Sequence, residues 1–256
     1  MATVPRALLD RYVALINGVT ANTLALTNTQ LAVAGFDPAT VKTIVKQMLK
    51  TASSAVSEVD KQFYEKVRQI NLGRAGSFDI VTRQLWDDDY IDRVIDSYYD
   101  DNGSPYDIGF DAESFADALS LFISRKINEA SKTYMNDYGD RDYVEPKYAR
   151  VPSGAETCAW CWALAGLGFH YKSAETASHS HDNCDCVVTP SWGAGVEGYD
   201  PGYYANAFNS AKYDMENGHI SDALRQRINE RADTVDGYTK NWNGVLATMR
   251  EKYGLK

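Results

Sequence analysis

Proline and glycine are scarce in this sequence, with 7 and 18 among 256 residues. Their scarcity excludes a collagen-like chain and a wholly disordered one. Hydrophobic residues make up 44% and charged residues 24% of the chain. A chain of this length and composition can bury a core and fold as one or two domains.

A long apolar run is also missing. Residues 12–36 carry no charge, but asparagine and threonine interrupt the ~20 apolar residues that a membrane-spanning helix requires. Near the start, Arg6, Asp10 and Arg11 occupy the place where a signal peptide has its apolar centre. We therefore expect no membrane partner and a protein that is made and kept in a cytoplasm.

Excess positive charge is absent as well, because the net charge is −9. This balance argues against a protein whose main task is to neutralise phosphates. The negative charge is concentrated in residues 79–117, which hold twelve acidic and two basic side chains. Such a run is typical of a solvated acidic face, and the alternative is a docking surface for a basic partner.

The common catalytic motifs are missing too. The sequence contains no H-E-x-x-H, no G-x-S-x-G and no P-loop pattern. No recognisable pair of a nucleophile and a base stands out elsewhere. We therefore expect a protein that is not an enzyme.

Apolar residues at three- and four-residue spacing predict helices over most of the chain. Asp37 and Pro38 form an N-cap and first-turn signature for one long amphipathic helix. The predicted helices cover about 6–16, 38–71, 80–98, 115–139, 219–233 and 239–253.

The four cysteines lie close together in the sequence. Cys158 and Cys161 form a C-x-x-C, and His181, Cys184 and Cys186 follow. A tight C-x-x-C turn directs two thiolates at one point, which suits zinc. These five residues are candidate ligands for four places, so a Cys₄ site and a Cys₃His site both remain open.

A closed structural site fits better than a catalytic one. The cluster offers enough protein ligands to fill a tetrahedron, whereas a catalytic zinc keeps one position for water. Asp182 and Asp185 are candidates for outer hydrogen-bond acceptors. Disulfides, a redox dithiol and buried thiols without metal are the alternatives, of which disulfides are disfavoured in a reducing cytoplasm. His170, His179 and His219 are expected to have surface or packing roles.

These features predict a mainly α-helical protein in three parts. Residues 1–148 form a helical body that contains the long amphipathic helix. Residues 149–192 form a small zinc-stapled loop and β-hairpin module, because Cys186 opens a β-prone stretch that ends at Pro190. Residues 193–256 form a loop rich in glycine and tyrosine, followed by C-terminal helices.

The cysteine module resembles the Mu F-like minor capsid proteins, the bacteriophage head morphogenesis family. The resemblance covers about residues 149–192 and rests on Ala149, Arg150, Val151, Pro152, Gly154, Cys158, Trp160, Cys161, Leu164, Ala165, Gly168, Phe169, Tyr171, His181, Asp182, Cys184, Cys186 and Pro190. Asp182 stands where many members have proline, and Asp185 where many have arginine, which weakens the expectation of a phosphate or DNA contact.

The resemblance implies a low-copy structural protein of the phage head. Its expected partners are the portal and/or the major capsid protein, with packaged DNA involved at most indirectly. Its expected roles are head assembly or genome delivery, and its expected location is the virion, after assembly in the cytoplasm of a bacterial host.

Two other functions remain open from the sequence. The first is a zinc-containing nucleic-acid-binding module, although residues 149–192 hold two basic side chains against four acidic ones. The second is a zinc hydrolase, such as a nuclease or peptidase.

Overall fold

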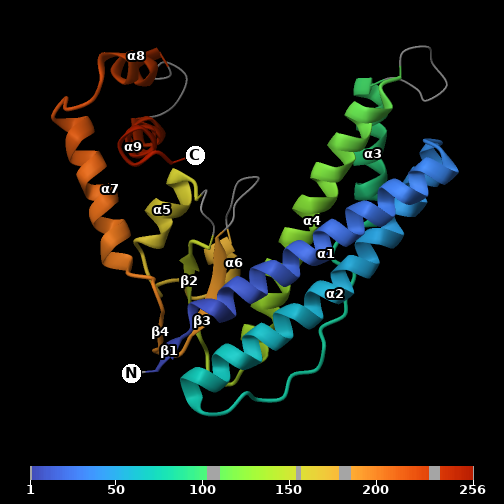
Figure 1. The fold of residues 1–256 in the computed structure, drawn as a ribbon, viewed down its shortest axis with the longest axis horizontal. Coiled ribbons are helices and arrows are strands. Elements are labelled where there is room, and N and C mark those ends of the chain that lie inside the picture. Colours follow the sequence, from blue (N-terminus) through green and yellow to red (C-terminus); the bar gives the residue numbers. More distant parts are fainter. Residues whose placement is uncertain (1, 103–109, 154–156, 179–185, 231–236, 256) are drawn as a thin grey trace. The chain divides into compact units, whose positions relative to one another are not determined.

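The computed structural model describes residues 2–102, 110–153, 157–178, 186–230 and 237–255, and it is mainly helical, as the sequence predicts (Figure 1). Contacts divide the chain into two compact units. We call residues 10–143 the helical unit, and residues 1–9 together with 144–256 the mixed unit. Among the helices of the described residues, none is long and apolar enough to span a membrane.

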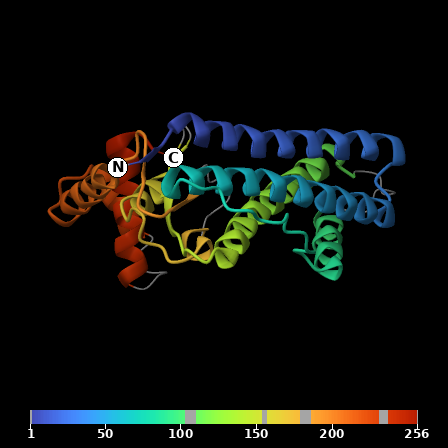
Figure 2. The same ribbon diagram turned by 90° about the horizontal axis from the view of Figure 1, so that it is seen from below.

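The helical unit is built from long helices. Helix α2 packs mainly against α4, α3 packs against both, and α1 runs beside α2 in both views (Figures 1 and 2). The bounds are Arg6–Ala34 for α1, Pro38–Leu72 for α2, Asp88–Asn102 for α3 and Ala112–Arg141 for α4.

The prediction for α2 is confirmed. The side chain of Asp37 accepts a hydrogen bond from the backbone N–H of Thr40 at 3.0 Å, and Pro38 occupies the first turn. The helix ends at Gly73, which has a φ of 74° and so adopts the left-handed conformation that favours glycine. Its buried stripe, with Val41, Val45 and Leu49 among its members, follows the expected helical period.

The predicted end of the first helix is wrong, because α1 continues from residue 16 to Ala34. The hydroxyls of Thr20, Thr23 and Thr27 each donate to the backbone carbonyl four residues earlier. Thr27 and Leu31 are also buried, at 2% exposure each. Tertiary packing therefore extends a helix whose residue types favour it only weakly.

The predicted start of the next helix is also wrong, because α3 begins at Asp88 and not near residue 80. Val81 is buried in a segment without regular structure. Its carbonyl accepts the hydroxyl of Ser57 at 2.6 Å, and its N–H donates to the Tyr138 hydroxyl at 3.2 Å. The apolar spacing in this stretch reflects a buried loop, whose backbone is satisfied by side chains from α2 and α4.

A buried polar group lies inside the helical unit. The hydroxyl of Tyr12 on α1 donates to Oδ1 of Asp60 on α2 at 2.6 Å, and Ser131 on α4 donates to the same oxygen at 3.0 Å. The other oxygen of Asp60 is buried and has no hydrogen-bond partner among the described residues. Burial raises the pKa of Asp60 well above its usual value, although the two hydroxyls oppose the shift.

This raised pKa predicts a stability that falls as pH rises. Between the ordinary carboxyl pKa of ~3.9 and the raised native pKa, the unfolded chain is ionised at Asp60 while the native protein keeps the proton. In that window each pH unit removes up to ~1.4 kcal/mol from the free energy of unfolding, and above it the loss levels off.

Urea unfolding of the native protein and of Asp60→Asn at successive pH values tests this prediction. The amide cannot ionise, so the variant is expected to gain stability relative to the native protein as pH rises. A stability difference between the two proteins that stays constant with pH contradicts it.

The mixed unit combines short strands with helices. Its elements are β1 Thr3–Val4, β2 Lys147–Val151, α5 Ala159–Ala165, α6 Ala174–Ser178, β3 Val187–Ser191, β4 Gly195–Val196, α7 Pro201–Glu216, α8 Asp222–Glu230 and α9 Gly237–Tyr253. Strand β1 pairs with β4 in parallel, and β2 pairs with β3 in antiparallel. The helices predicted near 219–233 and 239–253 correspond to α8 and α9.

Helix α7 corrects a prediction, because the sequence predicts a loop rich in glycine and tyrosine beyond residue 193 and no helix before about residue 219. Asp200 caps the helix by accepting from the N–H of Gly202 at 2.9 Å, and Pro201 follows in the first turn. Ala207 and Ala211 are buried on one face. The helix therefore forms from a cap and a narrow small-residue face, despite its tyrosine-rich sequence.

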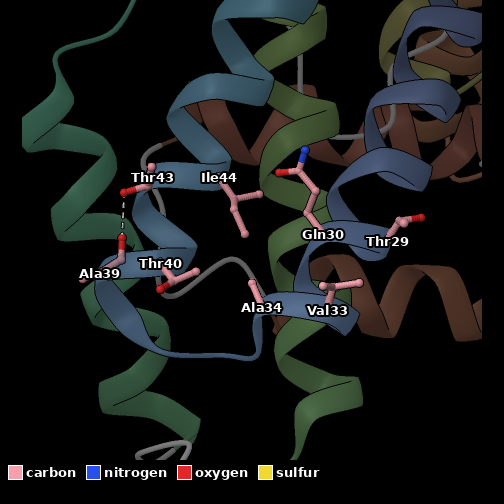
Figure 3. Close-up of a pocket in the computed structure, with 8 residues that line it drawn as sticks. All are labelled: Thr29, Gln30, Val33, Ala34, Ala39, Thr40, Thr43 and Ile44. Carbon is pink, nitrogen blue, oxygen red and sulfur yellow. Dashed lines mark hydrogen bonds between the residues drawn. The ribbon is translucent and has the colours of Figure 1, made fainter.

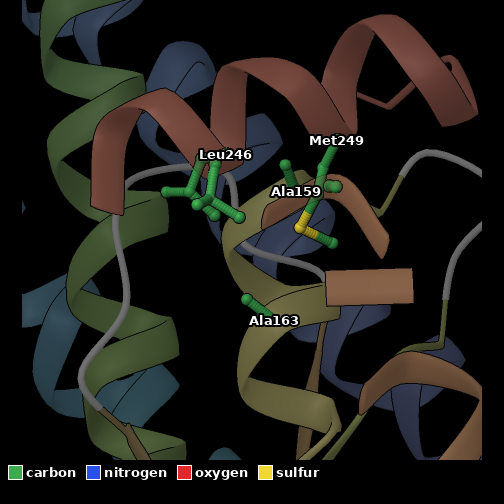
Figure 4. Packing of buried hydrophobic residues seen from close by; sticks show 6 residues of the cluster. Ala159, Ala163, Leu246 and Met249 are labelled. Atoms are coloured by element: carbon green, nitrogen blue, oxygen red, sulfur yellow. The ribbon is translucent and has the colours of Figure 1, made fainter. Parts of the chain in front are cut away.

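A small apolar core holds α5 against the C-terminal helices (Figure 4). Ala159 and Ala163 of α5 pack with Leu246 and Met249 of α9. Just beyond α5, a Cβ on Gly166 would come within 2.9 Å of the backbone nitrogen of Ala205 in α7. Only glycine permits this approach, so the position of α5 is fixed by close packing on its neighbours.

Candidate metal centre

A two-stranded antiparallel sheet of β2 and β3, here called the hairpin, carries one side of the cysteine cluster. Helices α5 and α6 lie between its two strands in the sequence. In the pairing of β2 with β3, Arg150 lies opposite Val188. Cys186 stands two residues before Val188, and side chains two apart along an extended strand point to the same face. The register therefore directs Cys186 and Arg150 to one face of the hairpin.

The start of α5 carries the other side. Cys158 is the N-cap of this helix, and its sulfur accepts a hydrogen bond from the backbone N–H of Cys161 at 3.3 Å. This is the bond that a C-x-x-C turn offers to a thiolate ligand. The helix start thus places Cys158 and Cys161 on the side that faces the hairpin.

The three described cysteines meet in one buried cluster. The sulfurs of Cys161 and Cys186 are 3.4 Å apart, and Cys158 belongs to the same cluster of buried residues. Their exposed fractions are 9% for Cys158, 0% for Cys161 and 8% for Cys186. All three are free thiols, so no disulfide joins them to one another.

The remaining predicted ligands, His181 and Cys184, lie outside the described residues, as do Asp182, Asp185 and His179. The structure thus brings together three of the five predicted ligands. Whether the set is Cys₄ or Cys₃His stays a prediction. His170 and His219 lie in the described part of the chain, and His219 is exposed beside Asp214 at 4.0 Å.

The donor set fits zinc chemically. Sulfurs bound at ~2.3 Å around one tetrahedral zinc lie about 3.8 Å apart, which is close to the 3.4 Å between Cys161 and Cys186. As they stand, the described residues contain no group of three or more His, Cys, Asp or Glu side chains arranged to hold a metal ion. A complete site would therefore need ligands from residues 179–185 and a small adjustment of the sulfurs.

The contact of Arg150 with the sulfurs is a feature that the sequence did not reveal. Its side chain is 1% exposed. Its Nε and Nη2 donate to the sulfur of Cys186 at 3.2 and 2.9 Å, and Nη2 lies 3.9 Å from the sulfur of Cys161. Strand alternation could have placed Arg150 on the face of Cys186, but only the strand pairing shows that the two meet.

Tyr171 stands near this cluster. Its backbone forms an isolated antiparallel bridge with Tyr148 of β2. Burial raises the pKa of Tyr171, the charge of Arg150 opposes the shift, and Cys186 and Cys161 add to it. The phenol oxygen is buried and has no hydrogen-bond partner among the described residues, so the environment of the sulfurs includes a protonated phenol.

Two grooves lie in the helical unit, away from the cysteines in sequence. The first, of about 560 Å³, lies between the end of α1 and the start of α2 and is lined by Thr29, Gln30, Val33, Ala34, Ala39, Thr40, Thr43 and Ile44 (Figure 3). None of these eight side chains is titratable. The groove therefore offers apolar contact without acid–base chemistry.

The second groove has a volume of about 740 Å³, and Lys46, Lys50 and Arg83 are among the residues that line it. Lys46 pairs with Asp92 at 2.7 Å, and Arg83 pairs with Asp137 at 3.0 Å. Most of its positive charge is thus compensated within the protein.

The sequence model of a known family, described as VG15 protein, matches residues 5–211. The match covers well over half of the chain, and it includes the helical unit, both strands of the hairpin and the three described cysteines. No curated protein and no solved structure matches the chain.

Proposed function

The chain belongs to the VG15 protein family, a family of phage proteins, and we propose that it is a minor structural protein of the phage head. In this proposal it binds the portal or the inner capsid and acts in head assembly or genome delivery. A zinc ion held by the cysteine module stabilises the fold of that module. The family match supports the phage origin, and the resemblance of residues 149–192 to Mu F-like proteins motivates the capsid role.

The observation that carries the proposal is the burial of the three sulfurs. Zinc that acts on a substrate needs a coordination position open to water. Cys158, Cys161 and Cys186 are each at most 9% exposed, and they join a helix start to a strand. Metal at such a point supplies folding free energy to a small module.

The position of Arg150 weakens the nucleic-acid alternative. A DNA-binding module needs basic side chains that reach phosphates. Arg150 is buried on the sulfurs, so Lys172 is the only exposed basic residue among the described residues of 149–192. A single lysine does not make a phosphate-binding surface.

Helix α3 supplies a surface suited to a basic protein partner. Asp92 and Asp96 are paired with Lys46 and Lys42 of α2 at 2.7 and 2.6 Å. The neighbouring residues 87–89 are all aspartate and exposed. These three aspartates are not members of the two ion pairs with α2. In the proposed assembly, their negative charge faces a basic patch of the portal or capsid protein.

The proposal predicts where the chain is found and what it contains. Quantitative mass spectrometry of purified heads and assembly intermediates is expected to detect it at a lower copy number than the major capsid protein. Elemental analysis of the protein, purified under reducing conditions without chelator, is expected to give one zinc per chain. Detection in infected-cell lysate together with absence from heads and their precursors contradicts the structural role.

A further inference from the structure

We infer that Arg150 is the positioning residue of the zinc site, because its guanidinium holds the Cys186 and Cys161 sulfurs and offsets the negative charge of a zinc–thiolate complex. The inference rests on the zinc site proposed above and adds a residue that is not a ligand.

Strand pairing fixes the backbone position from which the Arg150 guanidinium reaches the sulfurs. Arg150 is the fourth residue of β2, and its pairing with Val188 fixes its position against β3. Arg150 and Cys186 lie on the same face of the two strands. The Arg150 side chain therefore reaches Cys186 along this face. Strand β2 also contacts α5, which carries Cys161.

The guanidinium of Arg150 contacts the sulfurs along one edge, through two nitrogens. Nε and Nη2, on one edge of the guanidinium, both donate to Cys186, at 3.2 and 2.9 Å. The same Nη2 lies 3.9 Å from Cys161. A planar group with several fixed N–H donors can hold one sulfur with two bonds and approach a second, whereas a lysine ammonium acts as a point charge.

Charge gives the second reason. Zinc is divalent, so its complex with three or four thiolates is an anion. An anion in a buried place is costly unless a cation compensates it. Arg150 keeps its charge at all ordinary pH values and is itself 1% exposed, so it stabilises the loaded site more than a neutral side chain can.

Partners that orient metal ligands without binding the metal typically contribute ~10–100-fold to metal affinity. We therefore expect Arg150→Met to weaken zinc binding by ~10–100-fold. Arg150→Lys keeps the charge but loses the fork, so its loss is expected to be smaller than that of the methionine variant. Lys147→Met, at the first position of the same strand and exposed, is the matched control and is expected to bind zinc like the native chain.

The experiment uses the full chain and has three readouts. Zinc is titrated in competition with a chromophoric chelator to give affinity. Cobalt(II) replaces zinc to give the thiolate charge-transfer and ligand-field absorption. Hydrogen exchange of the β2 and β3 amides in the zinc-loaded protein reports whether the hairpin is intact. A positioning role is expected to shift the cobalt spectrum and weaken zinc binding while the hairpin stays protected.

The outcomes separate this inference from the proposed function. A native chain that binds no zinc overturns the zinc site itself. A native chain that binds zinc, with Arg150→Met equal to it in affinity and cobalt spectrum, overturns only the role of Arg150. Weakened binding that accompanies loss of hairpin protection assigns Arg150 a merely structural role and also overturns the inference.

If Arg150→Met does not fold, the Arg150→Lys variant decides. A folded Arg150→Lys protein with native zinc affinity and cobalt spectrum overturns the inference. Weaker zinc binding with a shifted cobalt spectrum supports it.

Discussion

Replacing Asp142 with asparagine is expected to lower the free energy of unfolding of the helical unit by about 3–5 kcal/mol. This is a large share of the ~5–15 kcal/mol that stabilises a typical domain. The effect follows from a buried ion pair between the ends of α2 and α4. Nε of Arg68 donates to one oxygen of Asp142 at 2.6 Å, and Nη2 donates to the other at 3.1 Å.

The cost is high because both side chains are buried, with exposed fractions of 1% for Arg68 and 0% for Asp142. Asp142 also accepts the hydroxyl of Tyr64 at 3.1 Å, and the hydrogen bond to Asp142 raises the pKa of Arg68 further above its usual value. An amide at position 142 leaves a charged guanidinium in the interior without the carboxylate that compensates it.

Hydrogen exchange followed by mass spectrometry measures this effect on peptides of α2 and α4. Asp96→Asn is the matched control, because the same chemical change breaks a 2.6 Å pair with Lys42 in which Asp96 is 53% exposed. Pairs of that kind contribute about 0–1 kcal/mol. Equal losses of protection in the two variants would falsify the special role of the buried pair.

How far the sequence predicts this fold depends on what forms each helix. The stripe of α2 and the start signal at Asp37 and Pro38 are local features, and the prediction for this helix is confirmed almost to the residue. The second half of α1 is different, because threonine favours a helix only weakly and the burial of Thr23, Thr27 and Leu31 depends on tertiary packing. A prediction from local sequence alone therefore ends that helix too early.

Helix α7 shows that the same signal can be missed. Asp200 and Pro201 repeat the cap and first-turn signature of Asp37 and Pro38. The glycines and tyrosines around them suggest a loop, and the buried face of the helix consists of the small residues Ala207 and Ala211. Such a narrow face gives little periodic signal, although it packs closely on neighbouring helices.

The cysteine cluster could be predicted only in part, because some of its contacts are local in the sequence and others are not. The C-x-x-C spacing is local, so the pairing of Cys158 with Cys161 follows from the sequence. The meeting of Cys161 with Cys186 follows only from the hypothesis that they share a metal. The contact of Arg150 with Cys186 depends on strand register, which no spacing motif contains.

Replacing Cys161 with serine is expected to remove zinc from the chain and to unfold the cysteine module. Cys161 of α5 contacts Cys186, the residue just before β3. Within the described residues, the sheet of β2 and β3 has two strands. A two-stranded hairpin alone is marginal in water. Structural zinc contributes about 10–16 kcal/mol of apparent binding free energy in isolated zinc-finger peptides, so losing even part of that amount exceeds what this hairpin can supply.

Elemental analysis and hydrogen exchange test this prediction together. Cys161→Ser is expected to contain no zinc and to lose protection in β2, α5 and β3, while α2 and α4 of the helical unit keep theirs. Ala163→Ser places a hydroxyl at another buried position of α5, where Ala163 is 8% exposed, and is expected to keep its zinc. When chelator is added to the native protein, its exchange pattern is expected to become that of Cys161→Ser. The exchange pattern of Cys161→Ser itself is expected not to change with chelator.

A Cys161→Ser protein that still holds one zinc per chain contradicts the site. Loss of protection in both units together shows that they fold as one cooperative structure, because zinc bound within the mixed unit can stabilise the helical unit only through coupling between the two.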